Sequence, residues 1–541
     1  MSHLLKKKWF VCIALIVLAF VLYFPSLQVG FLSDDFHMLA VAKENSNMFS
    51  YFATNIAGTT QGSSYGPMFN VITIAQYLAF GMNPLWYHVV SIGLYGFLSA
   101  VVFLFSRRIS GQTPSTLIAL LFVVLPGHVE AVSWIAVQVH LFATLFFVLS
   151  LYYYHRYVCA RNRWYFYLLA LLCASIALLT KEIAITFIAM FGLIDLFYGT
   201  SEKEHKKKIS IIKILKRISS RLLIPLGLVG GYLFVRHAVT GSVAGYYAGG
   251  AAGFTPYKYI RTTIEILSSM FLDFPKRFGV FHWMNDQRGL VVLLAIFALM
   301  FLFLSKQLHR KRTGFALLAL VIGLLPYMQV LLNPVNNEGE RYGLLPSIFV
   351  CMLMVYFFYA LLSVFGLAKK NEWLIAVLVI ATCVWMTPQV YSKQGSWVYA
   401  SDQVNKILHS AHDVSLEDAQ EVVVVGLPDN YEGAQALRNG FFEALLMQEG
   451  IEWKGERVPL YIHTDASEAL KVEHVIPDGK NKLIANKSFK VFTGFREYRV
   501  GEVKFSLEAF EMPGFLGESI LIEGESSAAL IYFDGEKLQK L

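Results

Sequence analysis

Two adjacent carboxylates, Asp34 and Asp35, follow directly on the first long apolar segment of the chain. The segment from Trp9 to Val29 is apolar for about twenty residues, which is long enough to cross a bilayer. Ionisable groups at the edge of a bilayer are costly to desolvate, so they indicate a functional site. A carboxylate at this position could accept a proton from a hydroxyl group, as a general base does. From position alone, a solvated loop that begins with two acids explains them equally well.

Other polar residues recur at the corresponding ends of later apolar segments. They are His37, His128 and Glu130, Lys181 and Glu182, Arg261, Asp273, Lys276 and Arg277, and Asn336 to Tyr342 with Glu338, Glu340 and Arg341. Carboxylates and cations gathered on one face predict a cavity for a charged substrate. Fixed cations can hold a phosphate group and stabilise it as it leaves; arginine does so bidentately and lysine as a point charge.

The elements that must position these residues are about eleven membrane spans. They are expected near residues 9–29, 85–105, 115–134, 138–155, 164–180, 183–199, 221–240, 289–306, 314–332, 343–365 and 373–391. Basic clusters alternate between the short loops, and Lys6–Lys8 precede the first span, which predicts a cytoplasmic N-terminus. An odd number of spans puts the C-terminal region and all the polar residues above on the outer side.

Composition supports a polytopic membrane protein with a soluble tail. The 541 residues are 56% hydrophobic, and the mean hydropathy is +0.52. The net charge of +8 combines +17 for residues 1–391 with −9 for residues 392–541. The basic excess reflects cytoplasmic loops and gives no evidence for a nucleic-acid partner. None of the five cysteines lies in the tail, so no disulfide framework or zinc cluster is implied there.

We therefore predict a polytopic α-helical membrane protein with a small C-terminal α/β or α+β extracytoplasmic domain. Residues 1–391 would form the transmembrane module and residues 392–541 the soluble domain. In the tail, Val422–Val425 has the pattern of a buried strand, and residues 434–448 have helical periodicity. Further strands are expected near 458–463, 489–494, 503–508, 519–523 and 529–533.

A base and phosphate-binding cations at a membrane surface suit glycosyl transfer from a lipid-linked sugar. The lipid chain would lie in the bilayer, the phosphate at the interface, and the sugar on the outer side. Such a donor needs no nucleotide pocket, and the sequence has no Gly-rich phosphate-binding loop.

The chain resembles the GT-C class of integral-membrane glycosyltransferases. Within that class it is most similar to the protein O-mannosyltransferases of the transmembrane and tetratricopeptide-repeat type and to their bacterial relatives. The resemblance covers roughly residues 10–365, and the order of the motifs makes it specific. The matching stretches are Phe31–Asp35, Phe80–Pro84 with Tyr87 and His88, Pro126–Trp134, Leu179–Glu182, and Glu340–Tyr342 with Leu345 and Pro346.

The resemblance implies an inverting transfer from a polyprenyl- or dolichyl-phosphate sugar, with Asp34 as the general base. Asp35 would position the acceptor or the base. His128 and Glu130 resemble a second acidic motif, although a satisfied polar turn at a helix end explains them nearly as well.

The candidates for binding the donor phosphate are Lys181 and Arg341. Their acidic neighbours Glu182 and Glu340 are expected to support them. Lys181 could instead form an ion pair with Glu182, and Arg341 with Glu340 or Glu338. Tyr342 completes the supporting set.

The chain also departs from the pattern of these relatives. Tyr65-Gly66-Pro67 stands where relatives often carry Tyr-Arg-Pro, and Val137–His140 replaces an expected Arg-Lys-Asp stretch. No tetratricopeptide array follows the membrane module. These differences leave the sugar and the acceptor open; the acceptor could be a protein, a lipid or a glycan.

No cofactor is required by these motifs, although a divalent metal ion remains an alternative. Asp34, Asp35, His128 and Glu130 have the hard ligands for such an ion. We expect an integral protein of a bacterial inner membrane, in contact with membrane lipid; an endoplasmic-reticulum membrane is topologically equivalent.

Two other classes of function compete with an enzyme. A transporter or flippase of a lipid-linked glycan would place its charges near the middle of the membrane and would show repeats. A scaffold would need far fewer spans to anchor its tail. The clustering of charges at the outer surface favours the glycosyltransferase.

Overall fold

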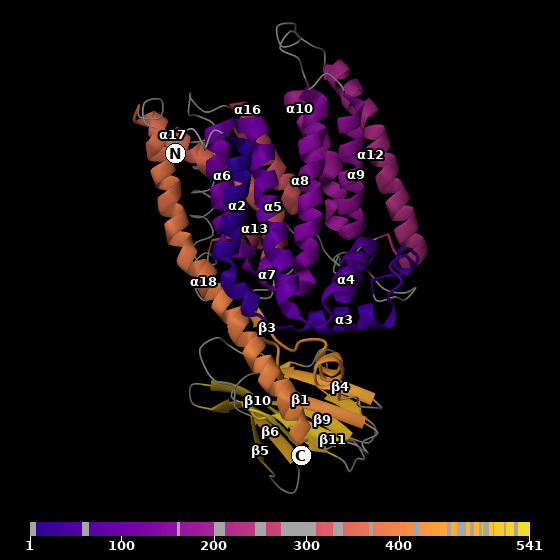
Figure 1. Cartoon of the computed structure of the whole chain (residues 1–541). Helices are drawn as coiled ribbons and strands as arrows, with labels where there is room; N and C mark the ends of the chain where they lie inside the picture. Colours follow the sequence, from indigo (N-terminus) through magenta and orange to yellow (C-terminus); the bar gives the residue numbers. More distant parts are fainter. Residues whose placement is uncertain are drawn as a thin grey trace.

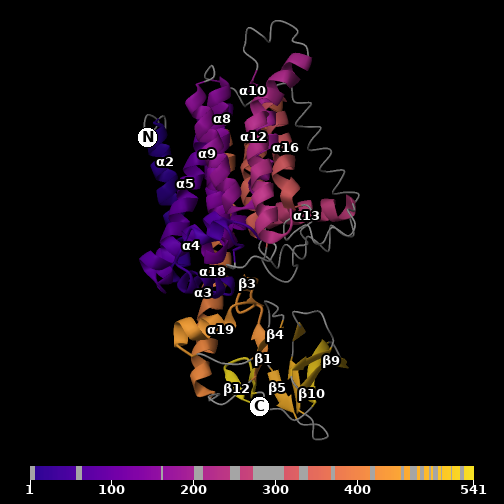
Figure 2. The same cartoon turned by 90° about the vertical axis from the view of Figure 1, so that its right-hand side faces the viewer.

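The computed structural model describes residues 7–56, 64–159, 163–199, 211–243, 256–271, 310–327, 339–366, 372–414, 421–451, 456–462, 472–475, 481–485, 489–490, 497–500, 503–512, 515–523 and 529–540. Long helices form a bundle, and a β-rich domain extends from one end of it (Figures 1 and 2). The N-terminus lies toward the opposite end (Figure 1). The helices of the bundle and of its end are α2 (Lys8–Leu22), α3 (Asp34–Glu44), α4 (Pro67–Phe80), α5 (Pro84–Ser110), α6 (Gln112–Val124), α7 (Val129–Ser133), α8 (Gln138–Cys159), α9 (Trp164–Thr180), α10 (Phe187–Tyr198), α12 (Ile211–Thr240), α13 (Pro256–Ser269), α16 (Arg310–Leu324), α17 (Leu344–Val364) and α18 (Glu372–Ser410).

Among the described residues, five helices are long and apolar enough to cross a membrane, or six if one bent pair counts as a span. These long apolar helices support the predicted polytopic helical fold. Apart from the segment near 289–306, which lies outside the described residues, every predicted span overlaps a helix. The total of eleven stays a prediction. Asp273, Lys276, Arg277 and Glu338 also lie outside the described residues.

The third predicted span, 115–134, is bent. It divides into α6 and the segment Pro126–Ser133, with a bend of 60° between them. Proline has no backbone N–H to donate, so the helix ends before Pro126. Gly127 then packs tightly, because a Cβ there would lie 2.6 Å from the Cα of Met270. The bend turns the Glu130 segment away from the axis of α6.

Helix α18 continues well beyond the predicted span at 373–391. It has 39 residues and crosses the predicted domain boundary without interruption. Two buried polar residues fix it against the bundle. The Nζ of Lys393 lies 2.7 Å from Glu340 Oε1, and the amide of Gln394 donates to the Leu22 carbonyl and accepts a bond from Ser26. Figure 1 shows α18 running along the bundle and into the β-rich domain.

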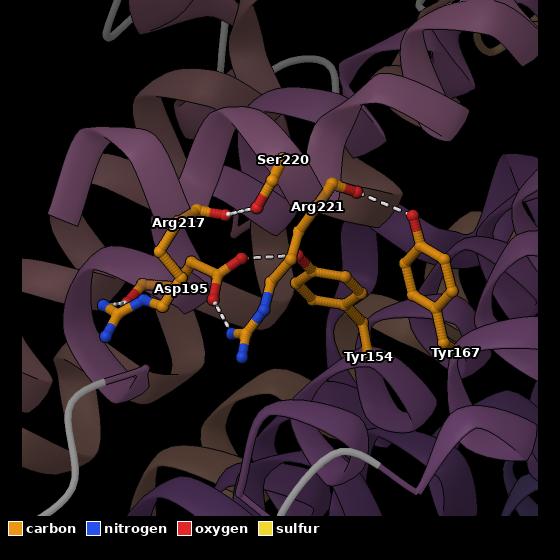
Figure 3. Close-up of polar contacts among 6 residues, drawn as sticks. All are labelled: Tyr154, Tyr167, Asp195, Arg217, Ser220 and Arg221. Atoms are coloured by element: carbon orange, nitrogen blue, oxygen red, sulfur yellow. Dashed lines mark hydrogen bonds and ion pairs between the residues drawn. The ribbon is translucent and has the colours of Figure 1, made fainter. Parts of the chain in front are cut away.

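A second polar cluster fixes α12 to the bundle, at the end away from the β-rich domain (Figures 1 and 3). Asp195 of α10 is fully buried and accepts a 2.5 Å hydrogen bond from the Tyr154 hydroxyl. Arg221 of α12 forms an ion pair with the same carboxylate, and its carbonyl accepts a bond from Tyr167 (Figure 3). Four helices thus share one buried charge pair.

The β-rich domain contains two five-stranded sheets. In the first, β1 (Glu421–Pro428) lies parallel to both β4 (Glu456–Ile462) and β11 (Ala529–Phe533). β12 (Leu538–Lys540) and β7 (Phe489–Lys490) form its edges. The second sheet is antiparallel, in the order β5 (Val472–Val475), β6 (Asn481–Ala485), β10 (Phe515–Glu523), β9 (Val503–Met512) and β8 (Glu497–Val500).

Most strands that were predicted in the tail correspond to observed strands, whereas the predicted helix over 434–448 is wrong at its start. β2 (Asn430–Tyr431) and β3 (Ala434–Gln435) form a small hairpin. Gly440 then takes a φ of +75°, which a helix cannot contain. Helix α19 (Phe441–Ala444) follows and passes into a π-helical turn at Leu445–Glu449. The segment between β3 and α19 contacts the bundle.

Candidate active site

A cavity of about 350 Å³ lies at the end of the bundle that faces the β-rich domain. Its walls come from α3, α4, the turn before α8, the end of α9, and the turn before α17. Four predicted site residues line it: Asp34, Lys181, Glu182 and Arg341. A cavity of this size is in the range of small-ligand sites. The structure therefore brings Asp34, the adjacent Lys181 and Glu182, and Arg341 to one cavity from three distant parts of the sequence.

Asp34 is placed by the first turn of α3, which begins at this residue. Acidic residues are favourable in the first turn of a helix, because that end carries partial positive charge. Its Oδ1 accepts a 2.6 Å hydrogen bond from the side-chain amide of Asn439, a residue of the β-rich domain. Asp34 is half-buried, so its carboxylate is held in place and also reaches the cavity.

Asp35 has a different environment from its neighbour and is not among the residues that line the cavity. Its side chain is fully buried, and its two oxygens accept bonds from the amides of Leu32 at 2.9 Å and Ala136 at 2.6 Å. Burial raises the pKa of this carboxyl well above its usual range, and the backbone bonds oppose that shift. Asp35 thus ties the loop that carries Asp34 to the turn after α7.

Arg341 lines the cavity and is held by Glu130. The Glu130 carboxylate is buried and accepts bonds from the Arg341 amide at 2.7 Å and from its guanidinium. The guanidinium carbon lies 4.9 Å from the ring centre of Tyr342 and 5.7 Å from that of Trp134. The predicted alternative pairing with Glu340 does not occur, because Glu340 binds Lys393.

Lys181 and Glu182 come from the break between α9 and α10. Helix α9 ends at Thr180, and Lys181 has an extended conformation with φ of −152°. A cation is favourable at this carboxyl end of a helix. The Glu182 Oε1 atom is buried and has no hydrogen-bond partner among the residues that the structure describes. A buried carboxylate oxygen without a partner is costly, which indicates that this side of the cavity receives a donor group from a ligand or water.

Three other predicted residues lie behind the cavity wall. The two ring nitrogens of His128 lie 2.7 Å from the Tyr95 hydroxyl and 2.9 Å from the Ser347 hydroxyl, in a fully buried position. Glu340 is buried against Lys393, and Tyr342 packs against Tyr327 at 4.8 Å between ring centres. Because both ring nitrogens of His128 have hydroxyl partners, its environment corresponds to the alternative interpretation, a satisfied polar turn.

The sequence analysis assigned no role to several residues that line the cavity or contact Asp34. His37 and His140 both line the cavity. His37 belongs to α3, the helix that begins with Asp34, and His140 stands where the relatives' Arg-Lys-Asp stretch was expected. Glu443 of α19 lies 3.6 Å from the His37 ring and, with neighbouring acids, raises the pKa of His37 above 6.5. Asn439 carried no signal, because a single amide in a polar segment is unremarkable in sequence.

The predicted metal ligands do not converge in a way that fits a divalent ion. Asp35 is engaged by backbone amides, His128 by two hydroxyls, and Glu130 by Arg341. Within the described part of the chain, one group of three metal-ligating side chains has its ligand atoms within 4.8 Å: His409, His412 and Glu449. That group lies at the junction of α18 and α19, and its members do not line the cavity.

Comparison with known proteins identifies relatives that match part of the chain. No protein-family model matches the chain. Over 199 residues it is 32% identical to the protein O-mannosyl-transferase Tmtc1 of Drosophila melanogaster, covering 35% of this chain and 23% of that protein. Over 407 residues it is 25% identical to human protein O-mannosyl-transferase TMTC4, covering 64% of this chain and 53% of that protein. The chain thus spans about half, or less, of the length of these relatives.

Solved membrane enzymes also align with the structure, at low similarity. An oligosaccharyltransferase of Archaeoglobus fulgidus aligns with a TM-score of 0.43 and 11% identity, over 83% of this chain and 62% of that chain. ArnT of Cupriavidus metallidurans aligns with a TM-score of 0.40 and 13% identity, over 87% and 97%. The resemblance that the motifs predicted is confirmed by the sequence matches: this chain is similar to the protein O-mannosyl-transferases of the TMTC type.

Proposed function

We propose that this protein is a GT-C membrane glycosyltransferase that moves a sugar from a polyprenyl-phosphate or dolichyl-phosphate carrier to an acceptor hydroxyl. The observation that carries this proposal is the placement of Asp34, Lys181 and Arg341 around one cavity at the end of the bundle. The sequence relatives are named protein O-mannosyl-transferases. Their names support a sugar as the group that is transferred and a hydroxyl as its acceptor.

In the proposed reaction Asp34 accepts the proton of the acceptor hydroxyl. The oxygen then forms a bond to the anomeric carbon on the face opposite the phosphate, so the configuration inverts. The bond between that carbon and the phosphate oxygen breaks, and the lipid phosphate leaves with the electron pair. Lys181 and Arg341 stabilise the negative charge that develops on it. Arg341 is suited to this role because Glu130 fixes its orientation before the donor binds.

We also propose the side of the membrane on which the cavity lies. The cavity and the β-rich domain lie at one end of the bundle and the N-terminus toward the other (Figure 1). With a cytoplasmic N-terminus, both the cavity and the domain are extracytoplasmic, as we propose for a bacterial inner membrane. The β-rich domain then lies where the acceptor must approach.

The experiment that tests this function is sugar transfer by the purified protein in lipid nanodiscs. A panel of labelled polyprenyl-phosphate sugars, mannose included, is offered to the wild type, to Asp34→Asn and to Asp402→Asn. Asp402 is an exposed carboxylate of α18 that does not line the cavity, so it controls for the loss of one charge. Turnover of a donor by the wild type and the control, with none by Asp34→Asn, is the expected result. Equal turnover by all three contradicts the assignment of the base.

A transporter of a lipid-linked glycan is distinguished in the same preparation. Reconstituted in vesicles, a flippase moves the labelled donor between leaflets without releasing the lipid phosphate. Movement of intact donor, without sugar transfer, would replace the proposed function.

A further inference from the structure

We propose that Asn439 of the β-rich domain is a positioning residue for Asp34, so that this domain forms part of the active site. The proposal rests on the proposed function, in which Asp34 is the base. It goes beyond that function because it assigns a residue outside the membrane module a defined task. Three sets of contacts support it.

The first set joins the backbones of the two parts around Ser33. The Ser33 backbone amide donates to the Ala436 carbonyl at 2.8 Å. The Ser33 hydroxyl accepts a bond from the backbone amide of Asn439 at 3.2 Å. Ser33 has a φ of +48°, an uncommon conformation for a residue with a side chain. The contact with the β-rich domain therefore stabilises the turn that aims Asp34.

The second contact is made by the side chains. The Asn439 amide donates to Asp34 Oδ1 at 2.6 Å. The bond joins the proposed base directly to a side chain of the β-rich domain. It also restricts the rotation of the carboxylate, and small errors in the position of a base reduce rate strongly. One side-chain amide thus holds the Asp34 carboxylate in a defined direction.

The third set shows that the donor is itself held rigidly. Ala436 and Leu437 donate backbone bonds to the carbonyls of Asp429 and Pro428, at the end of β1. Gly440 packs so closely that a Cβ there would lie 2.5 Å from the Ser33 carbonyl oxygen. The central strand of the first sheet, β1, is therefore connected to the turn before Asp34 through residues 436–440, which are held by backbone bonds and close packing.

The proposal predicts distinct kinetic effects for two substitutions at one position. Asn439→Ala removes the donor, and we expect kcat to fall about 10- to 100-fold with little change in the KM for the lipid donor. Asn439→Asp places a second carboxylate beside Asp34, which favours the protonated form of the pair. The acidic limb of the pH–rate profile should then move to higher pH. A purely structural role for Asn439 would not move that limb.

The matched control is Gln448→Ala, because Gln448 also bonds across the junction but does so at the surface, with Asn405 of α18. It should keep the kcat and pH profile of the wild type. Wild-type kcat in Asn439→Ala, or a higher kcat, would overturn the proposal. A gain would mean that Asn439 blocks the base. Gly440→Ala offers a second variant, expected to lower kcat by displacing the Ser33 turn.

A measurement that needs no sugar transfer separates this proposal from the proposed function. Hydrogen exchange of backbone amides over residues 31–40 should be faster in Asn439→Ala and Gly440→Ala than in the wild type and in Gln448→Ala. Unchanged exchange would overturn the contact even if the protein is an active enzyme. Absence of turnover by the wild type on every donor, with the exchange difference present, would instead reject the proposed function and retain the link between the two parts.

Discussion

Glu130 and Arg341, which lie 211 residues apart in the chain, are joined both through the Arg341 backbone amide and through its guanidinium. The carboxylate is buried, and the guanidinium side chain is only 11% exposed. Removing one partner of such a pair leaves an uncompensated charge in a poorly solvated place. The pair therefore sets both the stability of the turn before α17 and the position of a cavity cation.

We expect Glu130→Ala to lower the free energy of unfolding by about 3–5 kcal/mol, because it removes the buried carboxylate that binds the Arg341 guanidinium. Arg341→Ala should have a similar cost. The double variant should lose much less than the sum of the two, since the orphaned charge is then absent. Thermal unfolding in detergent across the double-mutant cycle measures this coupling, and strictly additive losses would disprove it.

Lys181→Ala should weaken the proposed binding of the lipid-phosphate donor. We expect the KM for the donor to rise about tenfold or more, because a charge-assisted bond to phosphate is worth about 1.5–3 kcal/mol. Lys181→Arg should recover much of the affinity, since it keeps the charge. The control is Lys43→Ala, an exposed cation of α3 that does not line the cavity. An equal effect of both alanine variants would point to general surface charge instead of a site.

Asp35 should matter for folding in a way that Asp34 does not. Asp35→Ala leaves the buried amide of Leu32 without its acceptor, at a cost of about 1–3 kcal/mol, and also removes the bond to the partly buried amide of Ala136. Asp34→Asn keeps the shape of a half-buried side chain, so its stability should stay close to that of the wild type. Thermal unfolding in detergent compares the two. A loss of stability in Asp34→Asn as large as in Asp35→Ala would contradict this division of roles.

The contact between α3 and α19 should depend on pH through His37. Glu443 is the largest cause of the raised pKa of His37; burial opposes it, and Asp34 and Glu44 add to it. A base whose pKa is higher in the folded state stabilises that state fully below 6.5, and the effect is lost as pH rises through the folded value. Protection of α19 from hydrogen exchange should therefore decrease as the pH rises from 6.5 through the raised pKa of His37, after correction for the intrinsic rate.

His37→Gln tests this origin of the pH dependence. The variant cannot ionise, so protection of α19 should become nearly independent of pH over the same range. A pH dependence equal to that of the wild type would assign it to other groups at the junction.

The sequence predicted the helices well because long apolar runs and basic loops are local signals. It also placed Asp34, Lys181 and Arg341 on one side, and the structure brings them to one cavity. The partner of Arg341 could not be read from the chain, since its neighbour Glu340 was the nearest acid in sequence. The actual partners, Glu130 for Arg341 and Lys393 for Glu340, are set by the packing of distant helices.

The contribution of the tail was also beyond local signals. Periodicity over 434–448 predicted a helix, but Gly440 and the hairpin before it interrupt that pattern. Asn439 owes its position to the bonds that residues 436 and 437 make with the end of β1. Such a position depends on the assembled domain, so no spacing rule in the sequence indicates it.

Helix α18 links the helix bundle to the β-rich domain as one continuous element. At about 1.5 Å of rise per residue, its 39 residues form a stiff rod whose outer half carries the β-rich domain. A change in the tilt of the membrane half is then passed on to the β-rich domain, except for the part that bending at Pro388 inside the helix absorbs. The thickness of the surrounding bilayer, which is one influence on helix tilt, can thus act on the β-rich domain through this helix.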